Sequence, residues 1–413
     1  MSSQSRQTQP GPGRIEFILL ISAVMMTVAF AIDSMLPALP AIGNALGVGE
    51  ENHRQWVISA FLMGFGVVLL CAGTLSDAWG RRRLMLWGLF GYSVTSLAAS
   101  LAPSFEILLA ARFAQGMAAA IGQVVVRSTV RDLYAGREMA QVMSLASSIF
   151  MMAPILAPAL GQLILIFGPW RWIFAALAVI GFFIWAWVLR RLPETLPVEK
   201  RTPIERATVL ASAKRVLTDR MSLGYSIASA MLSCALYGFL LSVQQIFEHV
   251  LRAPESLAAG FALMAAGMAV ASLVNAVIVK RFGMRLIGHL ALIFFTLMAG
   301  VHLLVASSGY ESMTSFVLLQ TLMMMGFSFT AGNFGAMAME NMGPVAGMAN
   351  SIQGSIGNIL GIIAGTLIGQ SFDGTTVPLY VGYFLAGLVA LAVVFVTEGG
   401  RFFVARNAPQ SLE

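Results

Sequence analysis

The sequence predicts an all-α membrane protein with twelve transmembrane helices, and two observations support this prediction. Of its 413 residues, 58% are hydrophobic and 11% are charged, whereas about a quarter of the residues of a soluble domain are charged. The chain also contains long runs without Asp, Glu, Lys or Arg, and a helix of roughly 20 apolar residues crosses a bilayer. A transmembrane β-barrel would instead show alternating strands of about ten residues, which the sequence lacks.

The predicted spans follow from these runs. Ten of them contain no charged residue: 55–76, 84–105, 139–170, 172–189, 221–247, 256–279, 286–310, 312–339, 341–372 and 374–397. Two more, at about 15–38 and 105–127, are interrupted only by Asp33 and Arg112. All twelve are expected to be helical, because a backbone in hydrocarbon must satisfy its own hydrogen bonds.

The twelve spans fall into two sets of six. The stretch 190–220 carries Pro193, Pro197 and Pro203 and is too charged to enter the bilayer. We therefore expect five segments: a cytoplasmic N-terminal tail 1–14, an N-terminal six-helix bundle 15–190, a cytoplasmic linker 191–219, a C-terminal six-helix bundle 220–397 and a cytoplasmic C-terminal tail 398–413.

An internal repeat supports this division. A shift of 203 residues places Gly80 on Gly283 and Arg82 on Arg285, in the turns after the second and the eighth span. Two parallel six-helix halves predict a rocker-type transporter, whose substrate site lies between the halves near the bilayer midplane. Glycines recur at every fourth residue over 357–369, and we expect them to form a packing seam between the halves.

The distribution of basic residues predicts the orientation. With the N-terminus in the cytoplasm, every Lys and Arg outside the spans lies on the cytoplasmic side except Arg54, Arg171 and Arg252. This bias predicts that both termini are cytoplasmic. It also accounts for the net charge of +6. We expect the basic surface to contact anionic lipid headgroups rather than nucleic acid. Alternatively, the apolar run up to Ala31 is a cleavable signal peptide, which would leave eleven spans.

Asp33 and Arg112 are the acidic and the basic residue that we place inside the spans. Charges at that depth are costly and persist mainly where they have a function. A rise of about 1.5 Å per residue puts both in the outer half of the bilayer. Desolvation raises the pKa of such a carboxyl and a nearby guanidinium lowers it, so a small rearrangement lets the carboxyl take up or release a proton. The two residues therefore predict a proton-coupling site. A static ion pair that fixes two helices is the alternative.

The turn after the second span resembles a family signature. It reads Gly73-Thr-Leu-Ser-Asp77-Ala-Trp-Gly80-Arg81-Arg82 and is similar to the G-x-L-x-D-x-x-G-R-[RK]-x motif of the major facilitator superfamily. The resemblance implies the major facilitator fold of two pseudo-symmetric six-helix bundles. It also implies a conformational gate at this turn, where Gly80 permits a tight turn and Asp77 caps a helix or pairs with arginines.

Three further segments resemble the drug:proton antiporters of the Bcr/CflA subgroup. They are Asp33-Ser-Met-Leu-Pro-Ala-Leu-Pro40, Arg112-Phe-Ala-Gln115-Gly116 and Ala153-Pro154-Ile-Leu-Ala157-Pro158-Ala-Leu-Gly161. The second segment is similar to the R-x-x-Q-G motif that this family uses in proton coupling. From the chemistry of a carboxyl beside a guanidinium we predict that Asp33 carries the proton, with Arg112 as its charge partner and Gln115 assisting by hydrogen bonding. The resemblance makes Pro154, Pro158 and Gly161 the antiporter motif of the fifth span, which the prolines are expected to bend. Ala153, Ala157 and Gln162 depart from the glycines of that motif.

The resemblance further implies a monomer of the bacterial inner membrane that exports small lipophilic drugs of the chloramphenicol and bicyclomycin type. The first span carries Met25 rather than a second acid one or two turns before Asp33, which favours neutral or zwitterionic drugs. A cavity for such drugs is mostly aromatic with few polar groups. The candidate substrate contacts share positions on inward-facing helices of the family's layout: Phe61, Phe65, Tyr237, Phe239, Ser242, Gln245, Phe327, Asn333, Gln353 and Asn358.

The sequence lacks the motifs of a nucleotide-driven pump, an enzyme or a metal-binding protein. There is no G-x-x-x-x-G-K-[ST] motif, and the four histidines lack metal-ligand spacing. We therefore expect no enzyme, no metal and no cofactor beyond the proton gradient, with drug, protons and membrane lipids as partners. A proton-coupled transporter of a metabolite such as a sugar or amino acid remains the alternative. A non-transporting sensor should lack both embedded charges.

Overall fold

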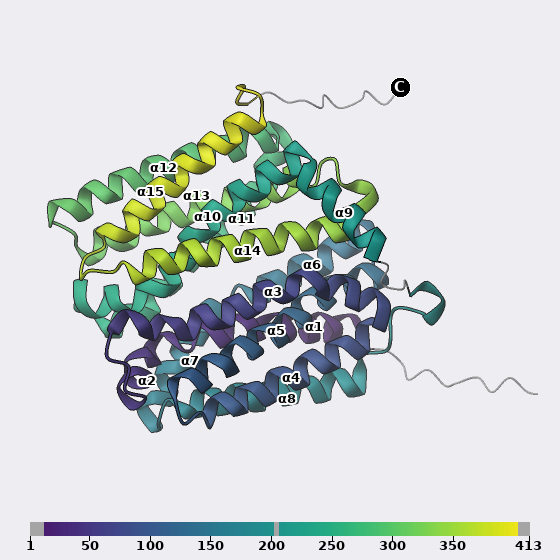
Figure 1. Ribbon diagram of the computed structural model, residues 1–413, viewed down its shortest axis with the longest axis horizontal. Helices are drawn as coiled ribbons and strands as arrows, with labels where there is room; N and C mark the ends of the chain where they lie inside the picture. The colour runs from purple at the N-terminus through teal and green to yellow at the C-terminus, as the bar shows by residue number, and fades with distance from the viewer. Residues whose placement is uncertain (1–11, 202–205, 404–413) are drawn as a thin grey trace, which may run out of the picture. The chain divides into compact units, whose positions relative to one another are not determined.

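The computed structural model describes residues 12–201 and 206–403, so most of both predicted tails and part of the linker lie outside the described residues. Fifteen α-helices make up this part (Figure 1). They are α1 (Arg14–Asp33), α2 (Leu39–Ala45), α3 (Trp56–Trp79), α4 (Arg81–Ser100), α5 (Phe105–Leu133), α6 (Gly136–Phe150), α7 (Ala153–Phe167), α8 (Arg171–Arg191), α9 (Arg206–Thr218), α10 (Arg220–Gln245), α11 (Leu257–Phe282), α12 (Met284–Ser308), α13 (Met313–Ala338), α14 (Ala346–Gln370) and α15 (Val377–Thr397).

The predicted all-helical membrane fold is confirmed. Among the described residues, eleven helical segments are long and apolar enough to cross a membrane, against twelve predicted spans. The remaining span corresponds to α4, which is also helical but begins with Arg81-Arg82-Arg83 and ends at Ser100. Its uncharged part is therefore shorter than the predicted 84–105.

Short polar side chains define where several helices begin. Ser104 accepts a hydrogen bond from the backbone N–H of Ile107 at the start of α5, and Asp219 does the same for Ser222 at the start of α10. Such caps satisfy backbone donors that have no partner within the first turn. They place the start of each helix close to the polar loops.

The predicted fifth span is divided into two helices. α6 ends at Phe150 and α7 begins at Ala153, so Pro154 lies in the first turn of α7 and Pro158 lies inside it. Proline is tolerated in a first turn, where its missing N–H would have had no partner. The sequence predicts a bend here, and the structure interrupts the regular helix with a two-residue turn, Met151 and Met152, whose backbone dihedral angles remain right-handed helical.

Contacts group the helices into two compact units. Unit 1 contains the chain up to Ala38 and residues 60–205, and unit 2 contains residues 39–59 and the chain from Arg206 onward. The segment 39–59 lies between α1 and most of α3 in the sequence, yet it groups with the second half, because its 3-10 helix Glu51–Gln55 packs against α14. The N-terminal half of the sequence and unit 1 are therefore not the same set of residues, because residues 39–59 belong to unit 2.

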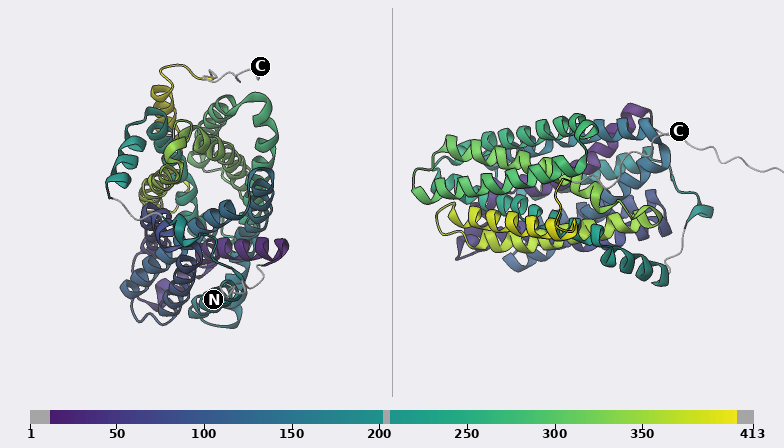
Figure 2. Two further views of the ribbon diagram at one scale, coloured as in Figure 1. Left: turned by 90° about the vertical axis from the view of Figure 1, so that its right-hand side faces the viewer. Right: turned by 90° about the horizontal axis from the view of Figure 1, so that it is seen from above.

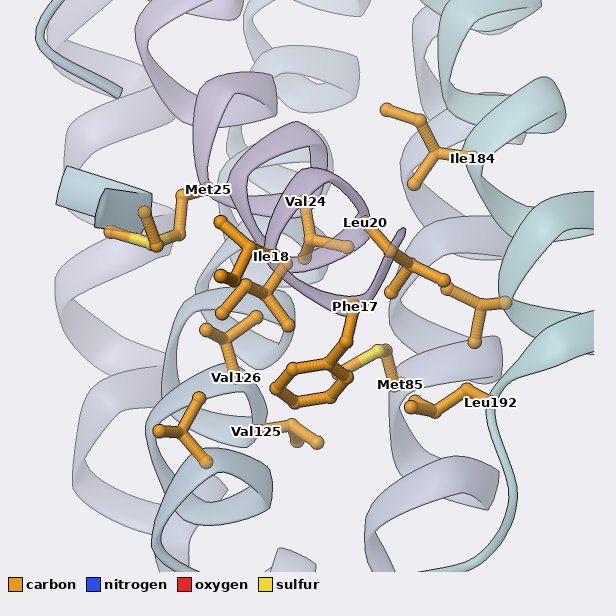
Figure 3. Close-up of a cluster of buried hydrophobic side chains, with 14 of the residues drawn as sticks. Phe17, Ile18, Leu20, Val24, Met25, Met85, Val125, Val126, Ile184 and Leu192 are labelled. Atoms are coloured by element: carbon orange, nitrogen blue, oxygen red, sulfur yellow. The ribbon is translucent and has the colours of Figure 1, made fainter. Parts of the chain in front are cut away.

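The core of unit 1 forms around α1. Phe17, Leu20 and Val24 of this helix are buried against Met85 of α4 and Ile184 of α8 (Figure 3). Each large apolar side chain so buried contributes dispersion contacts that fix the helix spacing. This packing fixes the N-terminal two-thirds of α1 within unit 1.

Unit 2 is organised around α10, which packs against α13, α14 and α15 (Figure 1). Figure 2 shows the helices from two further sides. Gly361 and Gly365 of α14 face α10, because a Cβ at these positions would come within 2.8 Å of Ser233 and 2.7 Å of Tyr237. The expected glycine seam between the halves is thus a seam within unit 2. The spacing of glycines at every fourth residue indicates that another helix packs closely against this face of α14. The spacing alone does not indicate that this helix is α10.

Candidate functional site

Asp33 is the last residue of α1 and is buried, with 5% of its surface exposed. Among the described residues its carboxyl makes no hydrogen bond and no ion pair. The chain then turns through the 3-10 helix Leu36–Ala38. An acid kept in a helical bundle without a fixed partner is well placed to exchange a proton.

The helix α7 approaches Asp33 closely because of a glycine. A Cβ on Gly161 would lie 2.2 Å from the carbonyl oxygen of Ser34 and 3.0 Å from the ring of Pro37. Only a residue without a side chain permits this approach. Gly161 of the predicted antiporter motif therefore contacts the backbone that directly follows Asp33.

Arg112 is fully buried in the middle of α5 and is surrounded by polar and aromatic groups. Its Nη1 donates a 2.6 Å hydrogen bond to Gln115 Oε1. Its guanidinium carbon lies 4.6 Å from the ring centroid of Phe61 and 5.7 Å from that of Phe174. Cation–π attraction of this kind stabilises a desolvated guanidinium.

Gln115 is itself held in place. Its Nε2 donates a 2.6 Å hydrogen bond to Ser96 Oγ, which donates in turn to the carbonyl of Tyr92. This arrangement directs the amide oxygen of Gln115 at Arg112. Gly116 allows the contact between α5 and α3, because its Cβ would lie 1.9 Å from the carbonyl oxygen of Phe61.

The structure places Asp33 and Arg112 in one unit, but it shows no ion pair between them. Arg112 is directed at Gln115 and the two rings instead. The predicted association of Arg112 with Gln115 is present in the geometry.

The predicted gate motif lies at the turn between α3 and α4. Gly80 has a φ of +93°, and Arg81 is only 3% exposed. The Arg81 side chain reaches Asp77 at 2.6 Å and Asp132, at the end of α5, at 2.9 Å. The Arg81 backbone N–H donates to Glu194, which follows α8, at 2.8 Å. One buried arginine thus joins the ends of α3, α5 and α8.

The remaining motif residues have smaller roles in this geometry. Arg82 donates from Nη2 to the carbonyl of Leu189 at 2.6 Å, and Gly73 lies partly buried within α3. A Cβ on Gly80 would lie 2.5 Å from Glu194 Oε2, so glycine is required both for the positive φ and for space.

Unit 2 contains a corresponding cluster. Gly283 has a φ of +80°, and Arg285 reaches Glu340 at 2.7 Å and Glu398 at 2.9 Å. Tyr225 also donates a 2.6 Å hydrogen bond to Glu398. The acids again lie near the ends of two helices, here α13 and α15. The weak sequence repeat at these turns therefore corresponds to a repeated arrangement of one arginine and several acids.

Sequence reasoning did not identify Asp132, Glu194, Glu340 or Glu398. A signal for Glu194 and Glu398 was present, because the shift of 203 residues carries Glu194 to within one residue of Glu398. For Asp132 there was no such signal. An acid near a helix end ordinarily indicates only a solvated surface.

The candidate substrate contacts are dispersed. Tyr237 and Asn358 are hydrogen-bonded to each other, and Phe239 stacks on Phe261. In unit 1, Phe61 lies under Arg112 and Phe65 packs on the cluster around Val68 and Ala120.

The other candidates are engaged elsewhere in unit 2. Gln353 bonds to Ser222, Asn333 to Asn275, and Gln245 to Asn52. Ser242 and Phe327 are buried in α10 and α13. Only Tyr237 and Asn358 are brought into direct contact with each other among the candidates.

These features define the class of protein: a multi-pass helical membrane protein with two embedded charges and repeated charge clusters at its helix turns. The sequence profile of the Major Facilitator Superfamily matches residues 19–366, and the chain belongs to this family of membrane transporters. It is a transporter of small molecules and not an enzyme.

Comparisons with individual proteins agree. The chain is 29% identical over 392 residues to the uncharacterized MFS-type transporter YdgK of Bacillus subtilis, covering 93% of this chain and 96% of that protein. It is 27% identical over 374 residues to a bicyclomycin resistance protein homolog of Haemophilus influenzae, covering 88% and 91%. A crystal structure of the human organic anion transporter MFSD10 superposes with a TM-score of 0.67 at 18% identity, covering 93% of this chain and 100% of that one.

Proposed function

We propose that the protein is a proton-coupled antiporter that exports small lipophilic, neutral or zwitterionic drugs by alternating access. The observation that carries the proposal is Asp33, a buried carboxyl without a partner among the described residues, next to the close contact of α7 with α1. Similarity to a bicyclomycin resistance protein homolog supports drugs as the cargo.

Asp33 is the proton carrier in this proposal. A carboxyl surrounded by apolar atoms favours its neutral form, whereas a guanidinium nearby favours the carboxylate. In the described conformation Arg112 is held by Gln115 and two rings, which leaves Asp33 free to keep a proton. Rearrangement of Arg112 toward Asp33 would then release that proton.

One proton per drug molecule supplies enough energy. A proton-motive force of about 150 mV is worth roughly 3.5 kcal/mol per proton, at about 2.3 kcal/mol per 100 mV. Because about 1.4 kcal/mol corresponds to a factor of ten, this force supports a drug gradient of a few hundredfold.

The two arginine clusters are the proposed gates of the cycle. Arg81 with Asp77, Asp132 and Glu194 locks the turn of unit 1, and Arg285 with its two acids locks the turn of unit 2. Both turns lie on the cytoplasmic side in the orientation proposed from the basic residues, with both termini in the cytoplasm of a bacterial inner membrane. The proposed active form is a monomer.

A drug-susceptibility panel tests this function. An efflux-deficient bacterial host expressing the protein should tolerate at least fourfold more chloramphenicol or bicyclomycin than the same host with an empty vector. A protonophore should abolish the difference. Unchanged susceptibility across the panel, with the protein detected in the membrane, would contradict drug export.

A further inference from the structure

A buried acid and a buried histidine meet in unit 2, at the end of α12 opposite to Arg285. Glu311, in the loop between α12 and α13, keeps 6% of its side-chain surface exposed, and its Oε1 lies 2.7 Å from Nε2 of His302. His302 lies on α12 and is fully buried. A rise of about 1.5 Å per residue puts it roughly 25 Å from Arg285 along this helix. The pair is therefore separate from the arginine cluster of unit 2.

The Glu311 carboxylate is held at both of its oxygens. While Oε1 faces His302, Oε2 accepts a hydrogen bond from the hydroxyl of Thr376, which precedes α15. In the described part of the chain, no Lys or Arg lies within ion-pair distance of this carboxylate. His302 is thus the side chain that can balance its charge.

Aromatic rings enclose the imidazole. The ring of Tyr380, on α15, stacks on that of His302 with 3.5 Å between the centroids, and Phe316 of α13 meets it edge-on at 5.9 Å. Tyr380 is the titratable side chain that faces the pair from α15, and Tyr383 lies behind it at 5.6 Å between ring centroids. The face of an aromatic ring attracts a cation within about 6 Å, so Tyr380 favours a positive charge on the imidazole.

Two buried nitrogens at this site have no hydrogen-bond partner among the described residues, Nδ1 of His302 and Nε2 of Gln320. Gln320 belongs to the site because its Oε1 accepts a 3.2 Å hydrogen bond from the Tyr380 hydroxyl. A buried nitrogen without a partner is costly, both for the N–H of an imidazolium and for the lone pair of a neutral ring that donates from Nε2. The unpaired Nδ1 therefore does not favour either charge state of His302, and the carboxylate and the tyrosine ring decide between them.

We propose that His302 and Glu311 form a proton-binding site in unit 2, separate from Asp33 in unit 1. The imidazole takes up the proton, and the carboxylate balances its positive charge. Without this proton the negative charge of Glu311 is buried without a cation, which is costly. The loss of water around the cation acts against proton binding, so the proton is held reversibly.

Solvent reaches the site through the loop. Tyr310, next to Glu311, is 88% exposed, so protons can arrive from the aqueous side of this loop. That side is the outer one in the orientation proposed from the basic residues. Proton binding at the pair depends neither on the cargo nor on the role of Asp33.

Nuclear magnetic resonance of the histidine rings measures this binding on the purified full chain in detergent, without any drug. Of the four histidine signals, that of His302 is the one missing in His302→Gln. It should change between about pH 5 and pH 9, because histidine ordinarily changes its charge near this range. Glu311→Gln should lower the midpoint by at least about one pH unit, a tenfold loss of proton affinity, because the imidazolium loses its counter-charge.

Two further variants separate the effect of charge from that of packing. Glu255→Gln, at an exposed acid of unit 2, should leave the midpoint unchanged. Thr376→Val removes a hydrogen bond from the Glu311 carboxylate, so the carboxylate depends more on the imidazolium and the midpoint should rise by roughly half a pH unit. A change that merely loosens the packing would not produce shifts in opposite directions.

The His302 signal has a second route to assignment if His302→Gln does not fold. In the double variant His53→Gln, His249→Gln two histidine signals remain. Phe402→Ala removes a ring 5.3 Å from that of His289, so the signal that it shifts belongs to His289 and the other belongs to His302.

Two results overturn the proposal. A His302 signal that stays constant across the pH range is one, because a constant charge marks a static ion pair and a constantly neutral ring binds no proton. Equal midpoints for Glu311→Gln and the unaltered protein are the other, because the carboxyl would then not be the counter-charge.

Discussion

Arg112 donates its 2.6 Å hydrogen bond to Gln115, three residues further along α5, and not to the buried carboxyl of Asp33. The two embedded charges are therefore separate in this conformation, and each has its own surroundings. If Asp33 carries protons, the contact between Arg112 and Gln115 is the restraint that must be released for Arg112 to approach it.

Replacing Gln115 by Leu should disturb coupling. The change removes the acceptor of a buried guanidinium, which costs about 1.5–3 kcal/mol for a hydrogen bond to a charged group. At about 1.4 kcal/mol per factor of ten, this conformation loses roughly ten- to hundredfold in population. Drug efflux should fall by a similar factor and depend differently on external pH.

Gln123→Leu is the matched control for this variant. Gln123 lies on the same helix and donates to the carbonyl of Met25 at 3.1 Å, far from the guanidinium in sequence. Its loss should leave the pH profile of efflux unchanged. Identical profiles for Gln115→Leu and Gln123→Leu would show that Gln115 has only a packing role.

Gly161→Ala should separate α7 from α1. The new methyl would lie 2.2 Å from the Ser34 carbonyl, so the backbone must shift, and overpacking of this kind costs about 1–3 kcal/mol. We expect at least a tenfold loss of efflux and a lower unfolding temperature in detergent. Gly91→Ala, whose methyl would meet its nearest neighbour at 3.4 Å, should be close to neutral. Full efflux by Gly161→Ala would mean that the approach of α7 is not needed.

Much of this architecture is predictable from the sequence. Charge-free runs show where helices cross the bilayer, because the cost of burying a charge is large. The position of Gly80 in its motif predicts the tight turn that its φ of +93° confirms. Asp33 and Arg112 can be recognised as functional candidates for the same reason, because a charge inside a span is costly to bury.

Other parts are not predictable because they depend on helix rotation and on contacts distant in sequence. The spacing of Arg112 and Gln115 indicates that they share one face of α5, but not that Arg112 is directed away from Asp33. Asp132 and Glu194 are ordinary acids at helix ends until folding brings Arg81 between them. Likewise, no local pattern assigns Gln55 to unit 2.

Removing the arginine of the first cluster should destabilise unit 1. Arg81→Ala leaves Asp77 and Asp132 without their cation. Because these acids keep 44% and 16% of their side-chain surface exposed, we expect a loss of about 1.5–3 kcal/mol, as for a hydrogen bond to a charged group. The exposed neighbour substitution Arg83→Ala should cost less than about 0.5 kcal/mol. Thermal unfolding in detergent measures both. Equal unfolding temperatures for the two variants would refute a structural role for the cluster.

In the cluster of Arg285 in unit 2, a single hydrogen bond can be removed without removing the arginine. Tyr225→Phe removes the 2.6 Å hydrogen bond to Glu398 and the 2.9 Å contact of the same hydroxyl with His289 Nε2, but leaves Arg285 in place. The loss should cost about 1.5–3 kcal/mol, as expected for a hydrogen bond to a charged acceptor. Urea unfolding in detergent gives the value, and Tyr310→Phe, at an exposed tyrosine, should be silent. An unchanged free energy of unfolding for Tyr225→Phe would contradict this prediction, because water would then replace the phenol hydroxyl at no cost in stability.

The most direct test of the account is the release of protons on drug binding. Purified protein in weakly buffered detergent, mixed with a drug that it binds, should release protons that a pH-sensitive dye records. The Asp33→Asn variant should bind the drug and release none, while Glu106→Gln, at an exposed acid on α5, should behave as the unaltered protein. Proton release of equal size from Asp33→Asn would contradict the assignment of Asp33 as the carrier.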